Sequence, residues 1–105
     1  MSKRLSKHKS FLKLLLTTDK SQARALMETI NKEQVEVLVE IFINLLKLDV
    51  PTNTKSLLKK RKRLISKLVN KRINVSTKLS AIRRHFRQVH NTLLSVKNKL
   101  LQLLQ

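Results

Sequence analysis

Five consecutive cationic side chains, at residues 59–63, are the strongest chemical signal in this sequence. On a helix such a run is spread around the whole circumference, so some members must point away from a core and can neutralise several phosphates at once. The run also fits a short nuclear-localisation signal. The alternative is a merely solvated charged face, which is weakened because the downstream cations, Lys78 among them, have no compensating acid.

Three arginines form a second cluster, in which Arg83 and Arg87 lie one helical turn apart and Arg84 lies beside them. Guanidinium groups match phosphate oxygens bidentately, but phosphate contacts position a protein without reading bases. Gln88 and Asn91 are expected to be ordinary surface residues, and no recognition-helix pattern is present. We therefore predict sequence-independent nucleic-acid binding. The candidate residues are Lys59, Lys60, Arg61, Lys62, Arg63, Lys67, Lys71, Arg72, Arg83, Arg84 and Arg87.

Charge is distributed very unevenly along the 105 residues, which carry a net charge of +18. Residues 14–49 contain all six acidic side chains, whereas residues 50–105 contain fifteen Lys and Arg and no acid. Such an excess destabilises an isolated compact domain by self-repulsion and favours a polyanionic partner. The expected partner is the backbone of a nucleic acid, DNA before RNA.

Catalysis is not expected. The chain has no Cys and no Gly, which excludes thiolate nucleophiles and glycine-rich phosphate loops. His85 and His90 are five residues apart and do not share a helical face, while His8 lies in a basic tail. Glu36 and Glu40 share a face but have no second carboxylate helix or partner histidine. We expect no enzyme, no catalytic residue, no metal and no cofactor.

Local signals in the first half predict three helices. The first spans about Ser6 to Leu16, the second is capped by Asp19, and the third is capped by Asn31 with Gln34 three residues later. The third, from Val35 to Leu48, is apolar around most of its circumference, so we expect the other helices to enclose it. Pro51 then ends this half.

The second half carries a cationic and aliphatic helix, followed by the clearest periodicity in the chain. Continuous heptads predict one long helix from Ser76 to Leu104, and Asn70 with residues 74–77 favours a break before it over a continuous helix. The e and g positions hold no acid, which disfavours a parallel homodimer. Packing on the central helix, an antiparallel dimer or a larger oligomer stays open. The residues assigned to oligomerisation or helix packing are Leu79, Ile82, Phe86, Val89, Leu93, Val96, Leu100 and Leu103.

The predicted fold is therefore all-α: a small bundle of four to five helices with a long, heptad-patterned C-terminal helix. Residues 1–50 would form the helical core, and residues 51–105 the basic region, within one structural unit. Two other functions stay open. The heptads suit a structural assembly protein that oligomerises or docks on a partner helix. The basic amphipathic segments Phe11 to Leu16 and Leu93 to Leu104 suit a membrane-active protein.

Four segments resemble small basic proteins of Polinton (Maverick) elements and adintoviruses: KHKSFLKLL at residues 7–15, Ala23 to Leu46, Leu57 to Arg72, and SAIRR at residues 80–84. Members of that family often end in a glycine-containing hydrophobic tail, which the heptads replace here. The resemblance implies a virion-associated protein that condenses a DNA genome, located in the nucleus or the virion.

Overall fold

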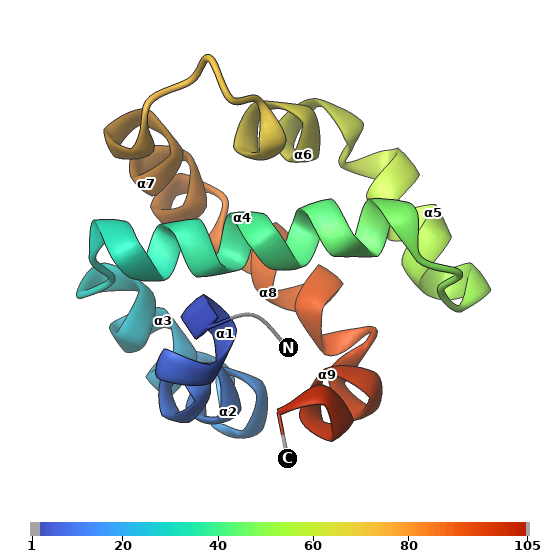
Figure 1. Ribbon diagram of the computed structural model, residues 1–105, viewed down its shortest axis with the longest axis horizontal. Helices are drawn as coiled ribbons and strands as arrows, with labels where there is room; N and C mark the ends of the chain where they lie inside the picture. The colour runs from blue at the N-terminus through green and yellow to red at the C-terminus, as the bar shows by residue number, and fades with distance from the viewer. Residues whose placement is uncertain (1–2, 105) are drawn as a thin grey trace.

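The computed structural model describes residues 3–104, which form nine helices and no strand. The molecule measures 30 × 28 × 27 Å. α4 crosses most of its width in Figure 1, with α6 and α7 on one side and α1, α2, α3 and α9 on the other. The helices are α1 (Lys3–Lys7), α2 (Lys9–Thr17), α3 (Lys20–Glu28), α4 (Lys32–Lys47), α5 (Thr52–Lys60), α6 (Lys62–Val69), α7 (Val75–Arg84), α8 (Phe86–Leu94) and α9 (Lys97–Leu103).

The predicted count of four to five helices, and the predicted long C-terminal helix, are wrong. The segment from Ser76 to Leu104 is divided at His85 and at Val96 into α7, α8 and α9. A straight helix of that length would measure roughly 43 Å at 1.5 Å per residue, which exceeds every dimension of the molecule. The breaks let one apolar stripe bend around the core instead of extending past it.

The breaks are kinks at which hydrogen bonding continues on both sides. At His85 (φ −112°, ψ 34°) the backbone N–H still donates to the Ala81 carbonyl, and the His85 carbonyl accepts from Val89. Arg61 and His8 divide their segments in the same way. None of these residues is Pro or Gly, the usual sequence signals of a helix break, so the sequence did not predict the kinks.

Side-chain caps start three helices. Asp19 accepts from the backbone N–H of Gln22, and Asn31 forms a complete capping box with Gln34, so both predicted helix starts are confirmed. Asn74 caps α7 by accepting from the N–H of Thr77. The chain therefore breaks between α6 and α7, as the sequence favoured.

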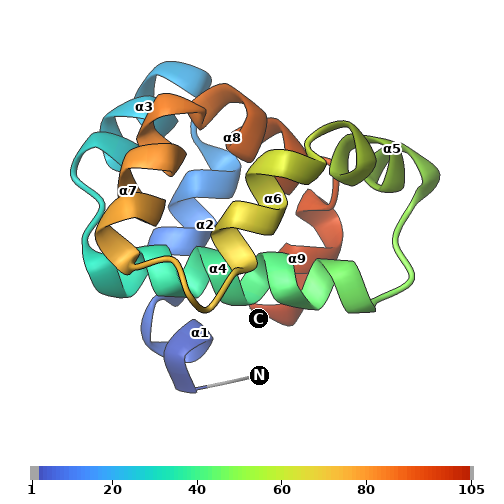
Figure 2. The ribbon, with the colours of Figure 1, turned by 90° about the horizontal axis from the view of Figure 1, so that it is seen from above.

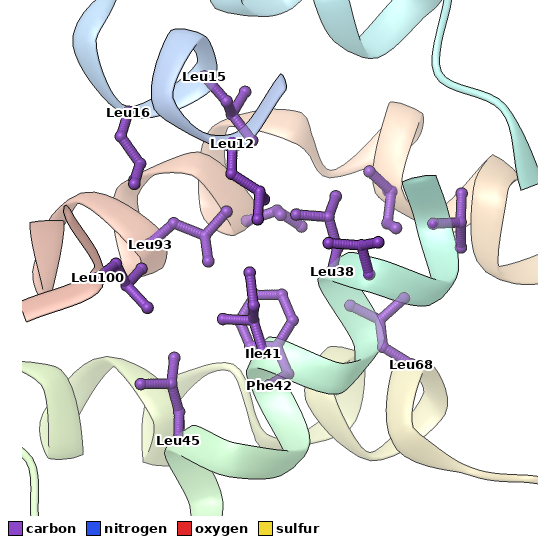
Figure 3. Close-up of a cluster of buried hydrophobic side chains, with 14 of the residues drawn as sticks. Leu12, Leu15, Leu16, Leu38, Ile41, Phe42, Leu45, Leu68, Leu93 and Leu100 are labelled. Atoms are coloured by element: carbon purple, nitrogen blue, oxygen red, sulfur yellow. The ribbon is translucent and has the colours of Figure 1, made fainter. Parts of the chain in front are cut away.

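One apolar core joins residues from both halves of the chain. Phe42 of α4 lies at its centre, with Leu12 of α2, Leu68 of α6 and Leu93 of α8 around it (Figure 3). The other side of α4 is less covered than predicted, because Val39 and Ile43 are only half-buried and Leu46 is 51% exposed.

The heptad positions are used inside the chain. Leu79 is half-buried and Leu103 is 53% exposed, and the other six are buried. The stripe packs mainly on α2, α3, α4, α5 and α6, so its burial requires no second copy.

A buried histidine lies where α8 packs near α2. His90 is 1% exposed, its Nε2 lies 3.0 Å from the Leu15 carbonyl oxygen, and its ring stacks on Phe86 at 5.2 Å. Burial lowers the pKa of His90 below its ordinary value of 6.5, the hydrogen bond to Leu15 opposes this, and nearby Lys20 lowers the pKa further. The neutral ring is therefore part of the core.

Acidification should destabilise the protein through His90. A histidine whose pKa is depressed in the folded state binds more protons when the protein is unfolded. Its contribution to the free energy of unfolding is therefore fully present above about pH 6.5 and is lost at lower pH, by at most about 1.4 kcal/mol per pH unit. We expect urea unfolding to show this loss between pH 7.5 and 5, and a His90→Leu variant to lack it. An equally steep loss in that variant would assign the effect to other groups.

Candidate nucleic-acid interface

The amphipathic pattern of α6 determines which of its charges face solvent. Ile65 and Leu68 are buried in the core. Lys62 and Ser66 are four residues apart, as are Arg63 and Lys67, so each pair shares a side of the helix. All four residues are exposed, on the side of α6 that faces away from the core. The kink at Arg61 leaves that residue half-buried.

A groove of about 440 Å³ runs between α5–α6 and α7–α8. Figure 2 looks onto this side, where α6 and α7 lie next to each other. Five cationic side chains line the groove: Lys60, Arg61, Arg63, Lys67 and Arg84. Leu64 and Ala81 also line it, so the long cationic side chains have an apolar surface beside them. We call this surface the basic groove.

The α7–α8 wall of the basic groove also holds polar residues that the sequence analysis did not assign to a site: Thr77, Ser80, His85 and Gln88. Hydroxyl and amide groups of this kind commonly donate to phosphate oxygens. A signal for three of them was present, since Thr77, Ser80, Arg84 and Gln88 are spaced by three and four residues. That spacing places them on one helix face.

A second, shallower hollow of about 470 Å³ lies along α6. It is lined by Lys60, Lys62, Arg63 and Ser66. Lys60 and Arg63 therefore border both hollows, whereas Lys62 and Ser66 border only this one. α6 is flanked by two basic surfaces.

No carboxylate neutralises the cations of either hollow within residues 3–104. The ion pairs there use other cations: Arg4 with Glu36 (3.6 Å), Lys7 with Glu33 (2.9 Å) and Lys55 with Asp49 (3.2 Å), and Nε2 of His8 lies 3.1 Å from the same Glu33 oxygen as Lys7. Lys7 and then His8 lower the pKa of Glu33 through hydrogen bonds to its carboxylate. The three acids that form ion pairs thus lie on α4, beside residues 4–8, and just before α5.

Arg83 serves a different purpose from its neighbour Arg84. Its Nε and Nη2 donate to the carbonyl oxygens of Met27 and Ile30, each at 3.3 Å, at the end of α3. Carbonyls at a helix C-terminus have no partner within the helix, and a cation there is also favoured by the helix dipole. Arg83 therefore joins α7 to α3 and is not among the residues that line the basic groove.

The remaining candidate cations are scattered. Lys59 and Arg87 are exposed on α5 and α8, and Lys71 and Arg72 are exposed in the α6–α7 connection. Lys71 borders a different cavity, which Glu36, Glu40 and the buried Lys78 also line. The fold therefore brings together Lys60 to Arg63, Lys67 and Arg84, and leaves the other candidates outside.

The described residues contain no group of three side chains that could hold a metal ion. Glu36 is paired with Arg4, and one buried oxygen of Glu40 has no hydrogen-bond partner. His90 is in the core, while His85 lines the basic groove. Within residues 3–104 no helix is both long and apolar enough to cross a membrane.

Substitution should separate the roles of the two adjacent arginines. Arg83→Gln should lower the free energy of unfolding by about 1 kcal/mol, because the carbonyls of α3 lose a charged donor. Arg84→Gln should leave stability unchanged and weaken DNA binding. Urea unfolding and the anisotropy of a labelled duplex measure the two effects. A loss of affinity in Arg83→Gln equal to that in Arg84→Gln, at unchanged stability, would place Arg83 in the interface.

No protein-family model matches the chain, and no curated protein or solved structure is significantly similar to it. The arrangement of the chain's own charged side chains therefore carries the functional assignment.

Proposed function

We propose that this protein binds the phosphate backbone of nucleic acid, and of DNA in particular, without reading its sequence. The observation that carries the proposal is the basic groove itself: five cationic side chains line one concave surface, and none is paired with a carboxylate of residues 3–104. Like charges gathered this closely repel one another, and a polyanion relieves the repulsion. Arg and Lys side chains in such an arrangement bind phosphate groups well, and the backbone of a nucleic acid is a polyanion made of phosphate groups.

The scarcity of exposed aromatic side chains favours phosphate contacts over base stacking. The chain has three Phe and no Tyr or Trp. Phe42 and Phe86 are buried, and Phe11 is half-buried. Stacking on aromatic faces is the usual way to bind splayed-out bases. The affinity would therefore come from electrostatics and depend strongly on salt.

Two other proposals need apolar faces that the fold has largely covered. Assembly through the heptads would use residues such as Phe86, Val89 and Leu93, which are buried in the core. Membrane binding would use the apolar side chains of α2 and of the last segment, most of which are buried, although Leu14 is 46% and Leu103 is 53% exposed. DNA binding uses side chains that are already exposed, and it needs no catalytic group.

Condensation of a DNA genome is the setting that the resemblance to proteins of Polinton elements and adintoviruses implies. A net charge of +18 on 105 residues suits that role, since condensation requires neutralisation of phosphates. Sequence-independent binding would allow many copies to cover one genome.

Binding should be lost steeply as salt is added. If six to ten phosphates are contacted, affinity for a duplex of arbitrary sequence should fall by about three to five orders of magnitude between 50 and 200 mM salt. A variant with Lys60, Arg63, Lys67 and Arg84 all changed to Gln should bind far more weakly, with a shallower salt slope. Electrophoretic retardation and anisotropy titrations measure both.

The matched control removes four exposed cations elsewhere, with Lys3, Lys13, Lys32 and Lys47 changed to Gln. Both variants lose the same charge, so a difference between them reports position and not net charge. Equal loss of affinity in the two variants would remove the basic groove from the account. A weak salt slope in the unmodified protein would contradict the proposal as a whole.

A further inference from the structure

α6 has the shape and charge of a ridge between two basic surfaces. Its apolar side, with Ile65 and Leu68, is anchored in the core. Lys67 borders only the basic groove, and Lys62 borders only the second hollow. Arg63 borders both, so it lies along the top of the ridge.

The spacing of the α6 side chains agrees with this arrangement. Lys67 lies one turn after Arg63 and borders the groove that faces α7, which Lys60 at the end of α5 also lines. Lys62 and Ser66 are four residues apart and share the next side. Each flank of the ridge thus carries its own cations, and across the basic groove Arg84 adds another.

We infer that the partner is double-stranded DNA, with α6 seated in its major groove and one phosphate strand along each flank. The inference rests on the proposed function and specifies its partner. An α-helix with its side chains is about 10–12 Å across, and the B-form major groove is about 12 Å wide. One phosphate strand would enter the basic groove between α6 and α7, and the other would lie along Lys62 and Ser66.

Other nucleic acids fit this ridge less well. A single strand could occupy the basic groove but would leave the second flank unused, and there are no exposed Tyr or Trp side chains on which its bases could stack. Duplex RNA has a deep, narrow major groove that protein side chains cannot enter. Only B-form DNA offers both flanks a phosphate strand at once.

The side chains along the top of the ridge predict little sequence preference. On α6, Arg63 is the residue that borders both hollows, and its guanidinium could donate to a guanine edge. One arginine does not specify a site, so the major groove would be used for fit and charge, in agreement with sequence-independent binding.

The test compares three ligands of the same sequence and length: a 16-base-pair DNA duplex, one of its strands, and the corresponding RNA duplex. Affinities are measured by anisotropy at 0.1 M salt for the unmodified protein and for Lys62→Gln, Lys67→Gln and the control Lys13→Gln, whose side chain is exposed on α2. We expect the DNA duplex to bind about tenfold or more tightly than either other ligand, because more phosphates are contacted.

The variants distinguish the two flanks. Each lost phosphate contact removes about one unit from the salt slope, or about tenfold in affinity at 0.1 M salt. Lys67→Gln should weaken both the duplex and the single strand, whereas Lys62→Gln should weaken the duplex alone. Equal affinity for duplex and single strand, or a duplex affinity of Lys62→Gln equal to that of Lys13→Gln, would overturn the inference. Failure to bind any of the three ligands would instead overturn the proposed function.

Discussion

The absence of any acidic residue after Asp49 is the constraint on which the rest of this structure depends. The second half of the chain cannot neutralise its own fifteen cations, and the six acids of the first half cannot balance them. Packing of aliphatic side chains must therefore hold the fold against electrostatic repulsion. The core around Phe42 provides that packing, with contributions from both halves of the chain.

The same constraint explains where the charges lie. Each helix of the second half buries an aliphatic side, such as Ile65 and Leu68 of α6, and most of the cations are exposed, with Lys78 of α7 a buried exception. The kinks at Arg61, His85 and Val96 divide the second half into short helices, and the connection at residues 70–74 joins α6 to α7, which lie next to each other. Two cationic surfaces then meet along one groove. The basic groove is thus a by-product of how a very basic chain buries its apolar residues.

Sequence information predicted those features that depend on neighbouring residues. Asp19 and Asn31 cap helices through hydrogen bonds that reach only three residues along the chain, and the apolar run of α4 identifies the core helix. The kinks were not predictable, since residues such as His85 carry no helix-breaking signal. The helix bends there because a bent path lets its apolar side chains pack in the core.

The candidate site shows the same division. The run Lys59 to Arg63 indicated a basic surface, but the direction of each side chain depends on the kink at Arg61. Arg83 differs most from expectation: it donates to Met27 and Ile30, which are 56 and 53 residues away in sequence. Only the packing of α7 on α3 creates that contact, so the spacing of the arginines alone could not predict it.

The most direct test of the account is the free energy of unfolding of the protein alone, measured by urea denaturation as a function of NaCl concentration. Urea carries no charge, so salt can be varied independently. If the cations are unpaired and apolar packing holds the fold, stability should rise with salt as screening relieves repulsion, most steeply up to about 0.2 M, where charges more than about 8 Å apart are largely screened. A stability that falls as salt is added would contradict the account, because it would mean that ion pairs, and not the aliphatic core, hold this chain together.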